Sequence, residues 1–292
     1  MKRAKNALVR FPNELVLAAT LTVFSLGSAV AQEDGGDATG TDPRAFTSKF
    51  MPYALYTELE NDVEIQQVNL FGMYAFSPDI AMTFDLPVWK EVDAGGVSGP
   101  LPPLGPNPGG GGGPDIPSDR KADGIGDLGL RFFYKPKPWQ FEKSSHMVGA
   151  EVTLPTATED ILGGDSWILS PMYVYVRDIK LISPGFVAFM NFYDFDIDKG
   201  DGRPDTSRFR GRWFLMQPLS KPGPGLFDGI YLLPELQPVY DFEEDEFSLW
   251  AAPEIGKMLP WGAAYVKPGF GIDNSEDSDR EFTFEIGFRY FF

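Results

Sequence analysis

Three arginines stand at alternate positions in one short stretch of the chain: Arg208, Arg210 and Arg212. Alternate side chains of a β-strand point to the same face, so these guanidinium groups would form a ladder. Other stretches carry further charges at positions that alternation places on the same kind of face: Asp85, Asp127, Arg131, Glu151, Glu235, Glu254 and Glu285. Facing rows of opposite charge create a transverse field, which orients dipolar solutes and sets ion preference.

Such an arrangement has two interpretations, and the sequence does not choose between them. The charges either line an open pore or form a structural network that fills a narrow barrel. Apolar residues also fall on inward positions by alternation, which suits an aromatic or otherwise apolar solute: Phe71, Met73, Phe133, Val187, Phe189 and Tyr193. A β-bulge in any of these strands would exchange its two faces.

The elements that must hold these charges are strands throughout. The pattern of strand and break repeats about twelve times, and the expected strands have about ten residues, the length of a tilted membrane-spanning strand. The fold class predicted is all-β, a single closed antiparallel transmembrane β-barrel with periplasmic termini. The expected strands are 50–59, 63–76, 80–92, 124–136, 147–156, 167–176, 186–195, 209–219, 230–240, 247–256, 263–272 and 280–292.

The last of these strands carries the strongest pattern. Apolar side chains fill every second position from Phe282 to Phe292, and polar or small residues fill the others. An aromatic edge strand of this kind would invite aggregation in a soluble protein, whereas lipid and closure onto the first strand remove that problem. A secreted soluble β-protein with an aromatic last strand is the alternative.

The end of the chain resembles the C-terminal signal of bacterial outer-membrane proteins. The resemblance rests on Glu285, Gly287, Tyr290 and Phe292, a spacing of polar, glycine, aromatic and final Phe. It implies that the barrel-assembly machinery is a partner of this chain.

The breaks between strands fall into two alternating sets. One set is long and acidic, apart from a Gly/Pro-rich segment at 93–123 with Gly109 to Gly113 in a row, and the other is mostly short and rich in Pro and Lys. Long outer loops and short inner turns are typical of outer-membrane barrels, so 93–123 is expected to be extracellular. One acidic loop is dense enough in carboxylates to bind Ca²⁺, and the alternatives are a solvated run or one bridged to lipopolysaccharide by divalent ions: Asp194, Asp196, Asp198, Asp201 and Asp205.

The N-terminus reads as a targeting segment. Lys2, Arg3, Lys5 and Arg10 precede an apolar run that is too short to span a membrane, and small residues follow at Ala29 and Ala31. Residues 1–31 are therefore expected to be a cleaved signal peptide, 32–48 a flexible lead and 49–292 the barrel. The protein would then reside in the outer membrane, in contact with its lipid and lipopolysaccharide.

Composition excludes several classes of protein. The formal net charge is −17, and removal of a basic signal peptide makes the chain more acidic still, so a nucleic-acid partner is not expected. The absence of cysteine excludes disulfides, thiolate metal ligands and a lipid-modified cysteine anchor. No motif predicts a cofactor. The single histidine, His146, is expected in a surface turn, which leaves no base for hydrolase chemistry, so the protein is predicted not to be an enzyme.

A wider resemblance covers about residues 50–292. The stretch from Asp123 to Phe132 is similar to the GLGDL strand of a family of outer-membrane proteins named for the meta-cleavage pathway of phenol degradation. The segments 84–88, 152–156 and 252–256 resemble other parts of the same family. The resemblance implies an outer-membrane barrel that transports a small-molecule solute. A channel for small solutes, including apolar or aromatic compounds, is the function predicted, and a non-conducting structural or surface-interaction barrel is the alternative.

Overall fold

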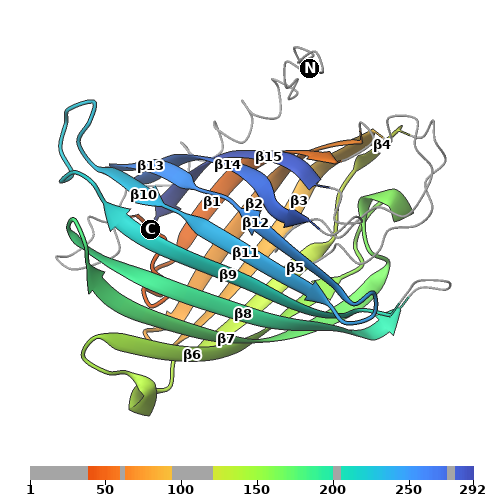
Figure 1. The fold of residues 1–292 in the computed structure, drawn as a ribbon, viewed down its shortest axis with the longest axis horizontal. Helices are drawn as coiled ribbons and strands as arrows, with labels where there is room; N and C mark the ends of the chain where they lie inside the picture. Colours follow the sequence, from red (N-terminus) through yellow and green to blue (C-terminus); the bar gives the residue numbers. More distant parts are fainter. Residues whose placement is uncertain (1–38, 60–62, 94–120, 200–204, 275–279) are drawn as a thin grey trace.

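Closure of one antiparallel sheet dominates the structure, a computed structural model that describes residues 39–59, 63–93, 121–199, 205–274 and 280–292 (Figure 1). The first strand, β1, pairs with the last, β15, as well as with β2. Fifteen strand segments form twelve strands, because the pairs β4/β5, β10/β11 and β12/β13 are each one interrupted strand. The predicted fold class is confirmed.

The strands are these: β1 Lys49–Leu59, β2 Glu64–Ser77, β3 Ile80–Asp93, β4 Lys121–Gly124, β5 Leu128–Tyr134, β6 Ser144–Leu154, β7 Ser166–Lys180, β8 Pro184–Lys199, β9 Ser207–Pro218, β10 Ile230–Leu233, β11 Glu235–Asp241, β12 Glu246–Ala251, β13 Glu254–Leu259, β14 Gly262–Asn274 and β15 Arg280–Phe291. Two short 3₁₀ helices, η2 Lys137–Trp139 and η3 Asp160–Leu162, lie in the connections. We call the end that holds Lys49 and Phe292 the terminal end, and the opposite end the loop end.

The two faces of the sheet have different surfaces. Large apolar side chains are exposed on the outside of many strands, as lipid contact requires: Tyr74, Phe76, Phe132, Tyr134, Tyr173, Ile255, Phe270, Ile286 and Phe288. The interior face holds the buried charges and a separate set of apolar side chains. Period-two alternation therefore sorts this sequence into an outer apolar face and a mixed inner face.

The inward apolar positions predicted on β8 are wrong. Phe186, Ala188, Met190 and Phe192 are the buried residues of that strand, so Val187, Phe189 and Tyr193 face outward. The strand is apolar on both faces, and alternation gives no way to choose between them. The other three inward predictions, Phe71, Met73 and Phe133, do face the interior.

Several predicted boundaries also shift. Strands β7 and β8 extend beyond 167–176 and 186–195, so residues 177–180 and 184–185, expected in a turn, are paired strand residues. Asp194 was expected in an acidic loop but lies inside the barrel on β8. Lys121–Gly124 is strand β4, paired with β3, whereas residues 94–120 of the Gly/Pro-rich loop lie outside the described residues.

His146 lies in strand β6 and not in a surface turn. Its imidazole faces outward among three aromatic rings, Phe141, Tyr173 and Tyr175, and its Nδ1 hydrogen-bonds the Tyr173 hydroxyl at 2.5 Å. Aromatic clusters with a polar edge are common where a barrel meets the membrane interface. The His146 side chain is therefore on the opposite side of the wall from the interior charges.

Residues 39–48 are not a free lead. The segment turns back across the terminal end of the barrel, where Thr39 is buried and Lys49 Nζ donates to the Gly40 carbonyl at 2.6 Å. Phe46 packs against apolar side chains inside the barrel and lies 6.0 Å from the Phe133 ring. The remainder of the expected lead, residues 32–38, lies outside the described residues.

Candidate channel interior

One side of the barrel interior is packed solid around buried ions. Asp194 on β8 accepts from Arg208 Nε at 3.1 Å and from both Nε and a terminal nitrogen of Arg210 on β9. A terminal nitrogen of Arg210 also donates to Glu151 on β6 at 2.9 Å, and Arg131 on β5 pairs with the same Glu151. Arg210 has no exposed surface, and Arg208, Asp194 and Glu151 are almost as deeply buried. We call these five residues the ion network.

Apolar side chains continue this packed region toward the terminal end. The interior faces of β5 to β10 supply Phe133, Met147, Met172, Val174, Val176, Phe186, Ala188, Met190, Phe192, Phe214, Met216 and Leu233. The ring of Phe192 joins the two parts, because the Arg210 guanidinium lies 4.9 Å from its centroid and that of Arg131 lies 5.2 Å away. Desolvated guanidinium groups are stabilised over an aromatic face. Most of these side chains are enclosed by one another, and Phe133, Met190, Phe214 and Leu233 form the edge of the packed region that faces the cavity.

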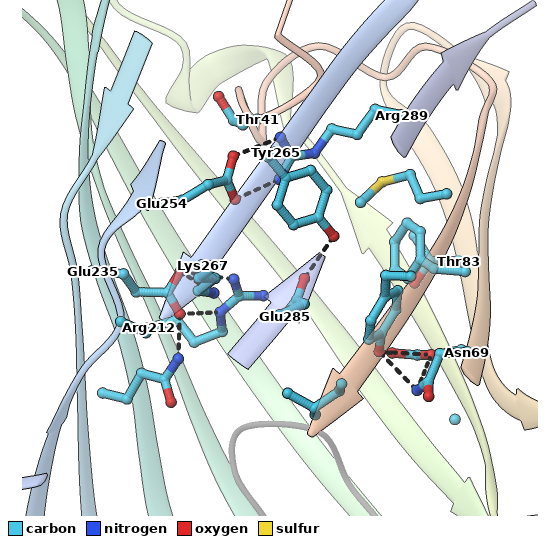
Figure 2. A pocket seen from close by; sticks show the side chains of 18 of the residues that line it. Thr41, Asn69, Thr83, Arg212, Glu235, Glu254, Tyr265, Lys267, Glu285 and Arg289 are labelled. Atoms are coloured by element: carbon cyan, nitrogen blue, oxygen red, sulfur yellow. Dashed lines mark hydrogen bonds and ion pairs between the residues drawn. The ribbon is translucent and has the colours of Figure 1, made fainter. Parts of the chain in front are cut away.

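The other side is hollow. A cavity of about 240 Å³ lies between the ion network and the walls formed by β1 to β3 and β11 to β15. On the cavity wall, Glu235 accepts two hydrogen bonds from Arg212 at 2.9 Å and one from Lys267 Nζ at 2.9 Å (Figure 2). Bidentate and charge-assisted hydrogen bonds of this kind are strong and hold the side chains in fixed positions.

A second ion pair lies nearer the terminal end. Arg289 on β15 donates to both oxygens of Glu254 on β13, at 2.6 and 2.7 Å, and the Tyr231 hydroxyl donates to the same carboxylate at 2.7 Å. The Arg289 guanidinium also lies 4.1 Å from the ring centroid of Tyr265. Figure 2 shows Glu254, Tyr265 and Arg289 close together, and they come from the neighbouring strands β13, β14 and β15.

Two carboxylates of the cavity wall are held by neutral groups. Glu285 accepts from the Tyr265 hydroxyl at 2.6 Å, and Asp85 accepts from the Tyr53 hydroxyl at 2.9 Å and from the Asn69 amide at 3.2 Å. Among the described residues, neither carboxylate has a cation within 4 Å. Both therefore keep acceptor capacity for a solute.

An inward-folded loop covers the cavity at the loop end. Asp127 accepts backbone hydrogen bonds from Thr156 and Ala157 at 3.0 Å and from Gly164 at 2.6 Å, so one carboxylate holds both limbs of the β6–β7 connection. The loop presents Ile161 and Leu162 to an apolar cluster with Leu59, Val63, Ile65, Val92 and Ala122. Lys90 Nζ donates to the Leu162 carbonyl at 3.0 Å. The loop, residues 155–165, thus lies across this mouth.

The N-terminal segment narrows the terminal end. Thr41, Asp42 and Pro43 line the cavity, and Lys135 Nζ donates to the Arg44 carbonyl at 3.0 Å while lying 5.0 Å from the Phe46 ring centroid. Burial lowers the pKa of Lys135, and the charges of Asp79 and Asp42 oppose that shift. Covers at both ends make the cavity a chamber within the barrel.

The predicted pore residues divide between the two regions. Seven line the cavity: Asp85, Asp127, Arg131, Arg212, Glu235, Glu254 and Glu285. Arg208, Arg210 and Glu151 face inward but lie in the ion network, away from the cavity. The strand that carries the three arginines, β9, therefore runs from the packed region into the hollow one.

Sequence reasoning missed several cavity residues. Lys267 and Arg289 follow the same alternation as the predicted charges and were detectable from it. Lys90 was hidden by a register shift between β2 and β3, which moves its strand from one inward parity to the other after Pro87. Tyr53 and Tyr265 could not be identified from the sequence, because tyrosine is equally common on the lipid face.

The C-terminal motif has a structural explanation for two of its residues. Glu285 faces the cavity, and a Cβ on Gly287 would lie 2.6 Å from the Tyr265 hydroxyl and 2.8 Å from Tyr53 Cβ. Tyr290 and Phe292 lie at the terminal end, and Phe292 is exposed. The glycine is thus required for the two tyrosines to pass over β15.

The described residues contain no helix of the length and hydropathy needed to cross a membrane. They also contain no group of three His, Cys, Asp or Glu side chains placed to hold a metal ion.

Comparison with known proteins points to a fold. No family model and no curated protein sequence matches the chain. Among solved structures, the COG4313 outer membrane channel from Pseudomonas putida F1 is similar with a TM-score of 0.60 at 12% identity, covering 89% of this chain and 100% of that one. The β domain of the Bordetella autotransporter BrkA matches with a TM-score of 0.43 at 12% identity, over 84% of this chain and 99% of that one. The first likeness supports the barrel fold independently of the strand pattern.

Proposed function

We propose that this protein is an outer-membrane channel for small solutes, with apolar and aromatic compounds among them. The observation that carries the proposal is the chamber inside the closed barrel, which a barrel serving only as a surface scaffold does not need. Its wall combines charged groups with apolar side chains such as Met51, Phe71 and Trp250. Pockets with an apolar lining and a few fixed polar groups suit small organic ligands.

The location follows from the same features. Exposed aromatic side chains on the outer face require lipid, and the expected signal peptide supplies the route across the inner membrane. We further propose that Glu285, Gly287, Tyr290 and Phe292 are read by the barrel-assembly machinery, and that the loop end faces lipopolysaccharide. Membership of the phenol-degradation family rests on the sequence motifs, and transport, not catalysis, is the activity proposed.

Solute passage requires the two covers to move. The loop 155–165 and the N-terminal segment 39–48 each lie across one end of the chamber, and each is held by a few polar contacts. A channel of this design conducts in steps, because conduction depends on discrete movements of the covers.

Single-channel conductance of the refolded protein in a planar bilayer tests the proposal. We expect small steps from the natural chain and larger steps after removal of residues 39–47, and the protein without residues 95–120 is measured beside them. Absence of steps in all three forms would favour the alternative, a non-conducting barrel, for which the ion network is the supporting observation. Heat-modifiable gel migration of an outer-membrane fraction separates both barrels from a secreted soluble protein.

The arginine ladder supplies a sharper version of this test. Replacement of Arg212 by Ser removes one cation from the chamber wall and leaves Glu235 with Lys267. We expect the reversal potential to shift toward cation preference. A matched change outside the chamber, Trp213→Phe on the outer face of the same strand, should leave it unchanged.

A further inference from the structure

Four ring side chains form a row across the outer wall of the barrel near the terminal end. The registers place His146 on β6 opposite Tyr175 on β7, Tyr175 opposite Phe189 on β8, and Phe189 opposite Trp213 on β9. Neighbouring ring centroids in this row are 5.0, 6.3 and 6.0 Å apart. The four strands lie side by side in Figure 1, with their terminal ends on the side of the C-terminus. We call this row the aromatic belt, because outward aromatic rows mark the level of lipid headgroups.

One cation lies just beyond the belt. Arg177 follows Val176, which is fully buried inside the barrel, so the arginine side chain faces outward, and it is exposed. It stands opposite Ser144, two residues before His146, on the side of the belt nearer the terminal end. Two residues of strand span roughly 6–7 Å, so the guanidinium is placed beyond the rings, at the level of lipid phosphates.

Arg177 has no acidic partner among the described residues. Its neighbour Asp178 faces the N-terminal segment, where it forms an ion pair at 2.7 Å. Lys143 and Lys180 are exposed at the same rim, and no ion pair within the described residues involves either of them. Glu142, also exposed there, pairs with none of the three cations. On a chain whose net charge is −17, this rim therefore carries a surplus of positive charge.

The His146 imidazole has one nitrogen available for a ligand. Its Nδ1 hydrogen-bonds the Tyr173 hydroxyl at 2.5 Å, and Nε2 has no partner among the described residues. When Nε2 carries the proton it is a donor, and Nδ1 then accepts from the tyrosine hydroxyl. Diagonal neighbours on one face of a sheet, such as His146 and Arg177, have Cβ atoms about 7 Å apart. Two side chains of this length can therefore hold one phosphate group between them.

We propose that Arg177 and His146 bind the phosphate of an anionic phospholipid of the periplasmic leaflet, with its acyl chains along the aromatic belt. The guanidinium supplies charge-assisted hydrogen bonds to the phosphate oxygens, and the imidazole supplies one more. The surplus positive charge of the rim favours a headgroup of net negative charge over a zwitterionic one. The proposal rests on the outer-membrane location proposed above and does not depend on conduction.

Lipid retention tests the site in the folded barrel. The probe is phosphatidylglycerol mixed with an excess of phosphatidylcholine in nanodiscs, and native mass spectrometry identifies the lipids that stay bound after release of the protein. The test variant is Arg177→Gln, which removes the charge and keeps a polar side chain. The matched control is Lys221→Gln, which removes an exposed cation at the same end of the barrel, in the β9–β10 connection.

We expect the natural chain to retain phosphatidylglycerol in preference to phosphatidylcholine. Arg177→Gln should reduce this preference about tenfold, the loss expected for one charge-assisted hydrogen bond. Lys221→Gln should keep the natural preference. Gel migration without heating shows whether each variant is folded, so a misfolded barrel is distinguished from a lost site.

The single histidine gives a second readout. Because the chain has one histidine, isotopic labelling of histidine nitrogen in a protein without a histidine tag reports His146 alone. We expect its Nε2 resonance to move when phosphatidylglycerol is added to the phosphatidylcholine nanodisc. The same resonance should stay in place in Arg177→Gln, because the phosphate is no longer held beside the imidazole.

Three results would overturn the lipid site. Equal retention of the two lipids by the natural chain would show that no headgroup is selected. Equal loss of preference in the Arg177 and Lys221 variants would assign the effect to the general charge of the rim. A His146 resonance that does not respond to phosphatidylglycerol would contradict the shared phosphate. Absence of the natural chain from an outer-membrane fraction would instead refute the location on which the proposal rests.

Discussion

Arg210 and Arg212 are two residues apart on one strand and face the same way, yet they have different surroundings. Arg210 is enclosed by Asp194, Glu151 and the Phe192 ring, and no part of it is exposed. Arg212 holds Glu235 with the same bidentate geometry, but its side chain is 26% exposed to the cavity. The boundary between a packed interior and a hollow one falls between them.

An inward-pointing charge can therefore have either of two roles, and its orientation alone does not determine which one. In the packed region each ion is satisfied by other protein groups, so its removal leaves a buried partner without compensation. In the hollow region ions meet the cavity, and their fields act on whatever enters. Under the proposed function, the same residue type thus serves stability in one place and solute recognition in the other.

The largest effect is expected from the packed region. Replacement of Arg210 by Ala leaves Asp194 and Glu151 buried with one cation each, and should lower the free energy of unfolding by about 3–5 kcal/mol. The same change at Arg212 should cost about 1 kcal/mol or less, because the cavity can admit water. Urea titration of the refolded barrels in lipid, followed by gel mobility, measures both. Equal losses at the two positions would remove the distinction between the regions.

Sequence reasoning reaches the fold because alternation survives in almost every strand. The aromatic row of β15, the sorted loops and the alternating charges all depend on local pattern, and local pattern sets which face a residue takes. It fails on β8, where Phe186 to Tyr193 is apolar on both faces, and after Pro87, where a bulge changes the parity.

The sequence could not predict which inward residues are packed and which line the cavity. Whether an inward residue packs or lines a cavity depends on which strands meet across the barrel, and Glu151 on β6 meets Arg210 on β9 across two intervening strands, β7 and β8. The same holds for Asp127, which lines the cavity and also accepts three backbone hydrogen bonds from a loop that no spacing predicts. Both contacts join residues far apart in the sequence, and they form only when the barrel closes.

The next effect concerns the cover at the loop end. In the Asp127→Asn variant, one carboxylate oxygen becomes an NH₂ group, which meets a backbone N–H that now donates to that oxygen. The lost hydrogen bond should destabilise the docked loop by about 1–3 kcal/mol. We expect the loop 155–165 to leave the mouth more often, so the open fraction in single-channel records should rise. Asp160→Asn, an exposed carboxyl in the same loop, is the control. Unchanged gating in the Asp127 variant would show that this loop does not limit conduction.

A smaller effect is expected at the terminal end. Phe46 is partly buried, and Phe46→Ala removes its contact with the Phe133 ring for about 1–2 kcal/mol of docking energy. Conductance should rise in the variant and approach that of the protein without residues 39–47. Thr47→Ala, a neighbouring change that keeps the ring, should behave as the natural chain. Conductance that matches in all three proteins would mean that the segment lies beside the path and not across it.

The smallest effect is a pH dependence of the same cover. Because burial lowers the pKa of Lys135 in the docked state, docking of the segment releases a proton and is favoured as pH rises. Acid therefore favours undocking, and conductance should fall as pH rises toward the ordinary lysine pKa near about 10.4. Lys135→Met should remove this slope, whereas Lys137→Met, at an exposed lysine two residues away, should keep it. If the pH dependence of conductance persists without Lys135, the titrating group lies in the chamber wall. The wall would then control conductance independently of the N-terminal segment and the loop 155–165.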